Sequence, residues 1–223
     1  FDKLRKGFIL DVGFENLKIK IIKKKKNFLV AKVISAGYLD NNKGVHIENK
    51  NIKLPPLTKK DLKAIEIGKK SGINHYALSF TNSHKDVLFF NKILPRYKKF
   101  FKIETGNAIK NLSSILKLCN NILIDRGDLS KDINLINVPV AQRKIQKLAT
   151  KKQKKVYVAT NLLESMVEKS YPTRSELNDI YNCLELGANG LVLAAETAVG
   201  KWPLDCVKML SAIIKRYEKE NKK

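Results

Sequence analysis

The chain has 223 residues, of which 43% are hydrophobic and 29% are charged, an ordinary composition for a globular core. It contains no apolar run of about 18 residues and no signal-peptide pattern at its start, so we expect a cytoplasmic protein with no membrane partner. The net charge is +23, but lysine supplies 38 of the 44 basic residues. Arginine binds base edges and phosphates better than lysine does, and arginine is scarce here. We therefore predict a solvated basic surface and no specific nucleic-acid partner.

Residues 1–54 are predicted to form a small all-β unit. Apolar and polar residues alternate over 16–21 and 28–33, as in strands with one buried face. The chain begins with Phe1 rather than with methionine, inside this β pattern, so we expect it to be part of a longer protein. Pro55-Pro56 separates the β unit from the remainder.

From residue 55 onward, strand-like and helix-like patterns alternate. Strands are predicted at Tyr76–Phe80, Lys99–Glu104, Ile122–Ile124, Val156–Thr160 and Gly190–Ala194. Helices are predicted from Thr58 to Gly72, from Ser83 to Leu94, around Ile109 to Leu116, over Val138–Ala149, from Thr173 to Leu186, and around Val207 to Ile214. We expect a loop between the third of these strands and the helix that follows it.

Capping patterns support three of these helices: Thr58 with Asp61, Ser83 with Asp86, and Thr173 with Glu176. The regular alternation predicts an α/β protein with a parallel sheet. Five such units are more than half of an eight-stranded barrel, and an open doubly wound sheet is the alternative. A nucleotide-binding version of the open sheet has little support, because the first strand-to-helix turn lacks G-x-G-x-x-G.

Charged residues lie at the ends of two neighbouring predicted strands. Lys102 and Glu104 are two residues apart, so they share one face of a strand while Ile103 packs on the other. Asp125 and Asp128 come directly after the next strand. A cation and several acids at the carboxyl ends of adjacent strands suit a divalent metal and an anionic substrate.

Several short motifs stand out along the chain, namely Leu54 to Asp61, Ala77 to Phe80, Lys102-Ile103-Glu104, Asp125 to Leu129, Val158 to Met166, Pro172-Thr173-Arg174 and Ala195 to Pro203. In order and spacing, these motifs together resemble the pyruvate kinase family. The resemblance implies a partial (β/α)8 TIM barrel with part of an inserted small β domain. Residues 1–54 would be the C-terminal part of that inserted domain, and 55–223 the second half of the barrel, with strands four to eight.

The resemblance also implies an activity, the metal-dependent transfer of a phosphoryl group from phosphoenolpyruvate to ADP, giving pyruvate and ATP in glycolysis. Lys102 would be the catalytic cation and would contact the substrate. Glu104 and Asp128 would hold Mg²⁺, a hard ion that prefers carboxylate oxygens. This chemistry needs neutralised charge more than covalent help from the protein, which agrees with the residue types present.

Other roles follow from the same resemblance. The backbone at Gly127 and Asp128 would receive the substrate carboxylate, Thr160 would lie on the substrate's other side, and Lys43 would contact the nucleotide. K⁺ is implied as a second cofactor, with ligands outside this chain. The first three barrel strands and a C-terminal domain are not represented, so we expect the chain alone to be inactive. The intact protein is expected to be a homo-oligomer, a tetramer in the family.

Five positions depart from the family pattern. Phe101 stands where a small residue precedes the lysine, and Asp125 stands where alanine precedes Arg-Gly-Asp. Ser130, Asn161 and Ala194 replace a glycine, a glutamine and a serine. We expect the bulky ring of Phe101 and the extra anion of Asp125 to disturb the substrate pocket, and the missing hydroxyl at Ala194 to weaken protonation of the enolate.

Two other functions remain open. Ile103-Glu104-Thr105 and Asp128-Leu129-Ser130 also resemble a metal-dependent enolate aldolase or lyase of the same barrel superfamily. The changed pocket residues and the high charge also suit a degenerate kinase domain kept as a non-catalytic binding module. Leu163 to Met166 and Glu196 to Ala198 favour the kinase.

Overall fold

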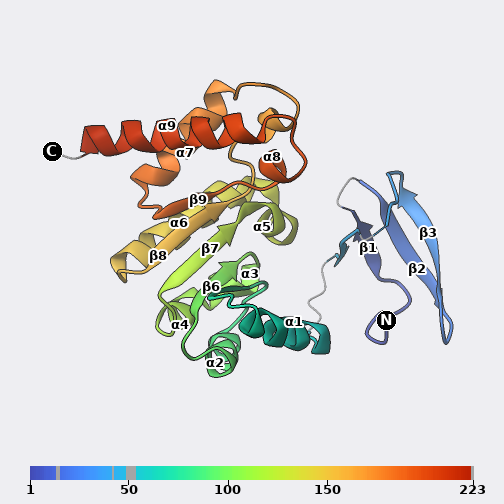
Figure 1. Cartoon of the computed structure of the whole chain (residues 1–223). Coiled ribbons are helices and arrows are strands. Elements are labelled where there is room, and N and C mark those ends of the chain that lie inside the picture. The colour runs from blue at the N-terminus through green and yellow to red at the C-terminus, as the bar shows by residue number, and fades with distance from the viewer. Residues whose placement is uncertain (14–15, 42, 49–53, 222–223) are drawn as a thin grey trace. The chain divides into compact units, whose positions relative to one another are not determined.

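The computed structural model describes residues 1–13, 16–41, 43–48 and 54–221. These form two compact units, Phe1–Pro55 and Pro56–Lys223, each described by itself (Figure 1). Residues 49–53, at the end of the β unit expected from the sequence, lie outside the described residues.

The first unit is an antiparallel sheet. Its strands are β1 (Ile9–Val12), β2 (Lys18–Lys24), β3 (Leu29–Ser35) and β4 (Val45–Ile47), in the order β3-β2-β1-β4. Every pairing is antiparallel, which confirms the all-β pattern in this part of the chain. A small core of Leu10, Val12, Leu17 and Ile21 lies on one face, because apolar residues alternate along the strands.

The second unit is built on a parallel sheet. Its strands are β5 (His75–Leu78), β6 (Lys98–Ile103), β7 (Asn121–Asp125), β8 (Lys155–Ala159) and β9 (Gly190–Val192), in sequential order. All pairings are parallel, as the alternating pattern predicts. Within the described residues the sheet is open, with β5 and β9 at its edges, and no closed barrel is present.

Most of the predicted helices are confirmed. They are α1 (Lys59–Lys70), α2 (His84–Ile93), α6 (Val138–Lys151), α7 (Arg174–Glu185) and α9 (Pro203–Asn221). The three predicted capping boxes are formed at the starts of α1, α2 and α7. None of the helices in the described ranges combines the length and the apolar character that a membrane crossing requires.

The single helix expected around Ile109 to Leu116 is wrong. The segment forms two short helices, α3 (Gly106–Lys110) and α4 (Leu112–Leu116), which meet at Asn111. The Asn111 side chain donates to the carbonyl of Asn82 at 2.8 Å, and its own carbonyl accepts from the Ser114 hydroxyl at 2.7 Å. Such side-chain bonds compete with a continuous helical ladder.

The loop expected before α6 is also wrong. The chain forms α5 (Arg126–Ile133) directly after β7, then a 3-10 helix over Leu135–Asn137. Asp125 caps α5, and its side chain accepts from the Asp128 N–H. The segment has few apolar residues at helical spacing, so its pattern gave little indication of a helix. Two short elements complete the unit, a 3-10 helix over Glu164–Val167 and α8 (Ala195–Ala198).

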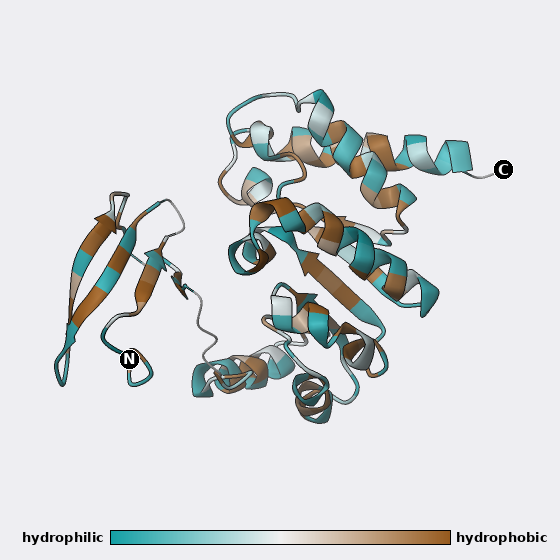
Figure 2. Ribbon diagram, turned by 180° about the vertical axis from the view of Figure 1, so that it is seen from behind, coloured by the Kyte–Doolittle hydropathy of each residue, from teal (hydrophilic) through white to brown (hydrophobic). Residues whose placement is uncertain are grey.

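The two faces of the parallel sheet differ in burial. On one face Phe101 and Ile103 of β6, Ile122 and Ile124 of β7, and Val156 and Val158 of β8 are fully buried in the main core. On the other, Lys102, Leu123 and Tyr157 stand in register on adjacent strands and are half-buried. In Figure 2 the helices of this unit carry both hydrophobic and hydrophilic residues, as expected when only one stripe faces a core.

The expectation that Phe101 disturbs the substrate pocket is wrong. Adjacent residues of a strand point to opposite faces, so Phe101 lies on the covered face and Lys102 on the other. The Phe101 ring packs edge-on against Phe90 of α2, with ring centroids 5.8 Å apart. It fills the core instead of the site.

Candidate functional site

Lys102 and Glu104 meet at the carboxyl end of β6. The Lys102 Nζ lies 2.9 Å from Glu104 Oε2. Glu104 is only 1% exposed, and its other oxygen, Oε1, accepts from the backbone N–H of Phe80 at 2.5 Å. Phe80, just beyond β5, has a φ of 51°, an uncommon conformation for a residue other than glycine, and it directs that N–H at the carboxylate. Adjacent strand ends therefore hold Glu104 in place.

Asp125, at the end of β7, gives Lys102 a second anionic partner. The distance from Lys102 Nζ to Asp125 Oδ2 is 2.8 Å. Burial by itself would lower the pKa of the Lys102 ammonium, but hydrogen bonds to Asp125 and Glu104 outweigh burial and raise that pKa above its ordinary value. Lys102 is therefore a fixed cation at neutral pH.

Three acids gather around this lysine. Oxygen atoms of Glu104, Asp125 and Asp128 all lie within 4.8 Å of one another. Burial raises the pKa of Glu104 above its ordinary value, while Lys102 and the Phe80 N–H oppose that rise. A group of carboxylate oxygens this close together is the donor set that suits Mg²⁺, so the residues fit a hard divalent cation. The structure brings together the two expected metal ligands and adds Asp125.

The predicted anion-binding backbone is the first turn of α5. The N–H of Gly127 donates to Thr160 Oγ1 at 2.8 Å, and the N–H of Asp128 points toward Asp125 Oδ1 at 3.4 Å. Asp128 is half-buried, and its Oδ1 lies 3.0 Å from Lys131 Nζ. The first turn of α5 therefore lies beside Thr160 and the acids, and the N–H groups of Gly127 and Asp128 have partners within the chain.

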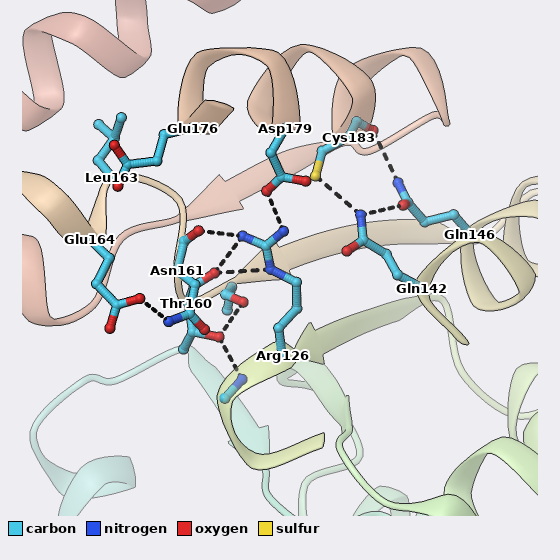
Figure 3. Close-up of polar contacts among 12 residues, drawn as sticks. Arg126, Gln142, Gln146, Thr160, Asn161, Leu163, Glu164, Glu176, Asp179 and Cys183 are labelled. Atoms are coloured by element: carbon cyan, nitrogen blue, oxygen red, sulfur yellow. Dashed lines mark hydrogen bonds and ion pairs between the residues drawn. The ribbon is translucent and has the colours of Figure 1, made fainter. Parts of the chain in front are cut away.

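Thr160 lies at the end of β8 in a strained turn. Thr160 and Asn161 have φ values of 69° and 52°, both in the left-handed region. Arg126 holds them there, since its guanidinium donates to the Thr160 carbonyl at 2.6 and 3.0 Å and to the Asn161 carbonyl at 2.8 Å (Figure 3). The same guanidinium forms an ion pair with Asp179 of α7.

Arg126 is a positioning residue that the sequence interpretation missed. It is 7% exposed, and it joins the start of α5 to the end of β8 and to α7. Its place within the Asp-Arg-Gly-Asp motif was the only available indication. Because an isolated buried guanidinium is costly, a buried arginine next to an acidic cluster implies specific acceptors elsewhere in the fold.

Lys43 belongs to the first unit. Its side chain lies against Gly13, where an added Cβ would meet the Lys43 Cδ at 3.4 Å. The residue is half-buried. The side chain therefore packs across the turn after β1.

Asn161 and Ala194, two further departures from the expected motif, also have clear structural partners. The Asn161 side chain hydrogen-bonds to Glu164 (Figure 3). The N–H of Ala194 donates to Glu196 Oε2 at 2.7 Å, and the other oxygen of that carboxylate accepts from the Leu163 N–H at 3.0 Å. Glu196 is 1% exposed, so this buried acid links the segments that follow β8 and β9.

Comparison with known proteins identifies the family of this chain. A family model described as the barrel domain of pyruvate kinase matches residues 3–207. The chain belongs to the pyruvate kinase family. The pyruvate kinase of Thermotoga maritima is 34% identical over 221 residues, which are 97% of this chain and 47% of that enzyme. The pyruvate kinase of Borreliella burgdorferi is 34% identical over 219 residues, which are 96% of this chain and 46% of that enzyme.

The pyruvate kinase of Mycobacterium tuberculosis is also 34% identical, over 197 residues, 86% of this chain and 42% of that enzyme. The chain thus spans about half the length of the curated pyruvate kinases that it matches. The resemblance first drawn from the motifs is confirmed at the level of the pyruvate kinase family.

Proposed function

We propose that the protein containing this chain transfers a phosphoryl group between phosphoenolpyruvate and ADP, giving pyruvate and ATP in glycolysis. The observation that carries the proposal is the ion pair of the half-buried Lys102 with Glu104, whose carboxylate lies close to that of Asp128 after the adjacent strand, in a chain of the pyruvate kinase family. The family match over 3–207 favours this reaction over that of an enolate aldolase or lyase.

Lys102 is the proposed catalytic residue. Transfer to ADP breaks the bond between phosphorus and the enol oxygen and leaves an enolate, whose carbon then takes a proton to give pyruvate. Negative charge grows on the enol oxygen and spreads over the moving phosphoryl group. A fixed ammonium in a partly buried site stabilises this charge without reorganising solvent. The raised pKa of Lys102 supports this role, because it keeps the cation present.

Glu104 and Asp128 are the proposed ligands of Mg²⁺. The bound ion would neutralise charge on the phosphoryl oxygens and on the substrate. Glu104 contributes a buried carboxylate that is held by the Phe80 N–H, and Asp128 contributes a half-buried one. K⁺ is proposed as a second cofactor whose ligands lie outside this chain.

The first turn of α5 is the proposed receiver of the substrate carboxylate, with Gly127 and Asp128 as donors and Thr160 beside them. Backbone N–H groups at a helix start favour anions. Lys43 is the proposed contact for the nucleotide. We further propose a cytoplasmic homo-oligomer, a tetramer as in the family, without nucleic-acid or membrane partners.

The direct test is a coupled assay of the full protein with phosphoenolpyruvate, ADP, Mg²⁺ and K⁺. We expect pyruvate and ATP in equal amounts, and no product when ADP or Mg²⁺ is left out. Absence of product under all of these conditions, from protein that still binds phosphoenolpyruvate, would instead support a non-catalytic binding module. One observation favours that second candidate: the lysine is already paired with Asp125.

A further inference from the structure

Asp125 touches the groups that the proposed reaction assigns to its anionic substrate. Its Oδ2 lies 2.8 Å from Lys102 Nζ. Its Oδ1 lies 3.4 Å from the N–H nitrogen of Asp128, in the first turn of α5, and 3.4 Å from Thr160 Oγ1. Asp125 is only 9% exposed, so the carboxylate depends on these partners rather than on water.

A cation, a helix-start N–H and a hydroxyl around one point form a binding site for a carboxylate. In this chain a carboxylate of the protein is already at that point. Helix capping accounts for only part of the arrangement, because a contact of 3.4 Å is long for a capping bond. The shorter contact, to Lys102, has no role in capping.

We propose that Asp125 is a specificity-determining residue that occupies the position of the substrate carboxylate, so that an anionic substrate binds only by displacing it from Lys102 and α5. The inference rests on the proposed function. The Asp125 carboxylate also has acids close by, since oxygen atoms of Glu104 and Asp128 lie within 4.8 Å of it. Displacement therefore costs free energy, and the affinity for phosphoenolpyruvate is lower than these donors alone would give.

The test compares Asp125→Asn and Asp125→Ala with the wild type in the full protein. Asparagine caps a helix about as well as aspartate, so Asp125→Asn removes the charge and keeps the cap. Asp132→Asn is the matched control: Asp132 is an exposed acid of the same helix whose carboxylate accepts from the Gly106 N–H at 2.6 Å. Calorimetry with Mg²⁺ present gives the Kd for phosphoenolpyruvate, and a separate titration gives the Kd for Mn²⁺.

We expect both Asp125 variants to bind phosphoenolpyruvate roughly tenfold more tightly, the scale of one hydrogen bond to a charged group. The control should stay within about twofold of the wild type. The gain should persist at about 1 M KCl, where a Debye length of about 3 Å removes distant electrostatic effects but not a direct contact.

Unchanged or weaker binding in the two variants would overturn the inference. So would a gain that disappears at high salt, because that gain would come from distant charge. If both variants lose Mn²⁺ affinity together with phosphoenolpyruvate affinity, Asp125 is a metal ligand and the inference is wrong. The proposed function is judged separately by wild-type turnover, which any of these binding results leaves intact.

Discussion

At the scale of single residues, the site depends on how one lysine and its acids share charge. Lys102 lies between Glu104 and Asp125, at 2.9 and 2.8 Å, and is itself half-buried. The acids keep the lysine charged, and the lysine allows the acids to remain buried in a place where water cannot solvate them well. A change at any of the three therefore affects the others.

Glu104→Gln in the full protein should abolish turnover while the fold remains intact. Glutamine has nearly the same shape and can still accept from the Phe80 N–H, but it gives a divalent cation no negative charge. Steady-state assays over a series of Mg²⁺ concentrations measure turnover. Circular dichroism checks that the fold is intact. Glu168→Gln is the control, since that acid is exposed and pairs only with Lys201 in the described contacts. Retained activity at saturating Mg²⁺ would remove Glu104 from the site.

Lys102→Met should lower kcat by roughly 100-fold or more, with a smaller change in KM. A cation that faces growing negative charge stabilises the transition state more than the bound substrate. The substitution also leaves two buried carboxylates without their partner, so the melting temperature should be measured alongside the kinetics. An effect confined to KM would contradict a role in the transition state.

At the scale of secondary-structure elements, capping side chains decide where helices begin. Thr173 and Glu176 form the capping box of α7, and the Glu176 carboxylate also accepts from the Ser165 N–H at 2.7 Å and from the Ser165 hydroxyl at 2.5 Å. One side chain thus ties α7 to the turn after β8. Burial pushes the pKa of Glu176 upward, but the bonds from Ser165 and Thr173 outweigh it and hold that pKa below its ordinary value.

This pKa shift predicts a loss of stability in acid. A carboxyl whose pKa is lower in the folded state stabilises the fold above its unfolded pKa, about 4.3, and loses that contribution as pH falls through the folded value. Glu176→Gln keeps the capping box and removes the charge. Denaturant unfolding should show the wild type about 1 kcal/mol more stable near pH 7, with the difference vanishing in acid. A difference that is the same at both pH values would exclude the ionised carboxylate as its source.

At the scale of the whole molecule, the parallel sheet ends in two unpaired edges. Within the described residues, β5 and β9 each have one neighbour. The sheet face with Lys102, Leu123 and Tyr157 is also less buried than the face against the helices. Unpaired edges and a partly covered apolar face favour association with other chains.

Residues 1–223 expressed alone should therefore show no pyruvate kinase turnover and should self-associate. Repulsion from the net charge of +23 opposes association most at low salt, where it is least screened, so larger species should appear as salt is raised. Size-exclusion chromatography at two salt concentrations, with the coupled assay on each fraction, measures both properties. A stable monomer with turnover would show that the residues present are sufficient.

Local patterns were enough to predict most of the elements of this protein and its family. The strands around Lys102 and Asp125, and the capping box at Thr173, follow from residues close together in the chain, where periodicity and capping act. The two failures have different causes: Asn111 interrupts a helix through a bond to a segment distant in the chain, and α5 begins at its cap without an apolar stripe.

The contacts that define the site needed the tertiary structure. The sequence indicated that Lys102 and Asp125 end neighbouring strands, but only strand register sets them 2.8 Å apart. The packing of α2 gives Phe101 its partner Phe90 in the core, and the packing of α7 gives Arg126 its partner Asp179. Such contacts join residues far apart in the chain, and their geometry depends on the pairing of strands and the packing of helices, which no local pattern specifies.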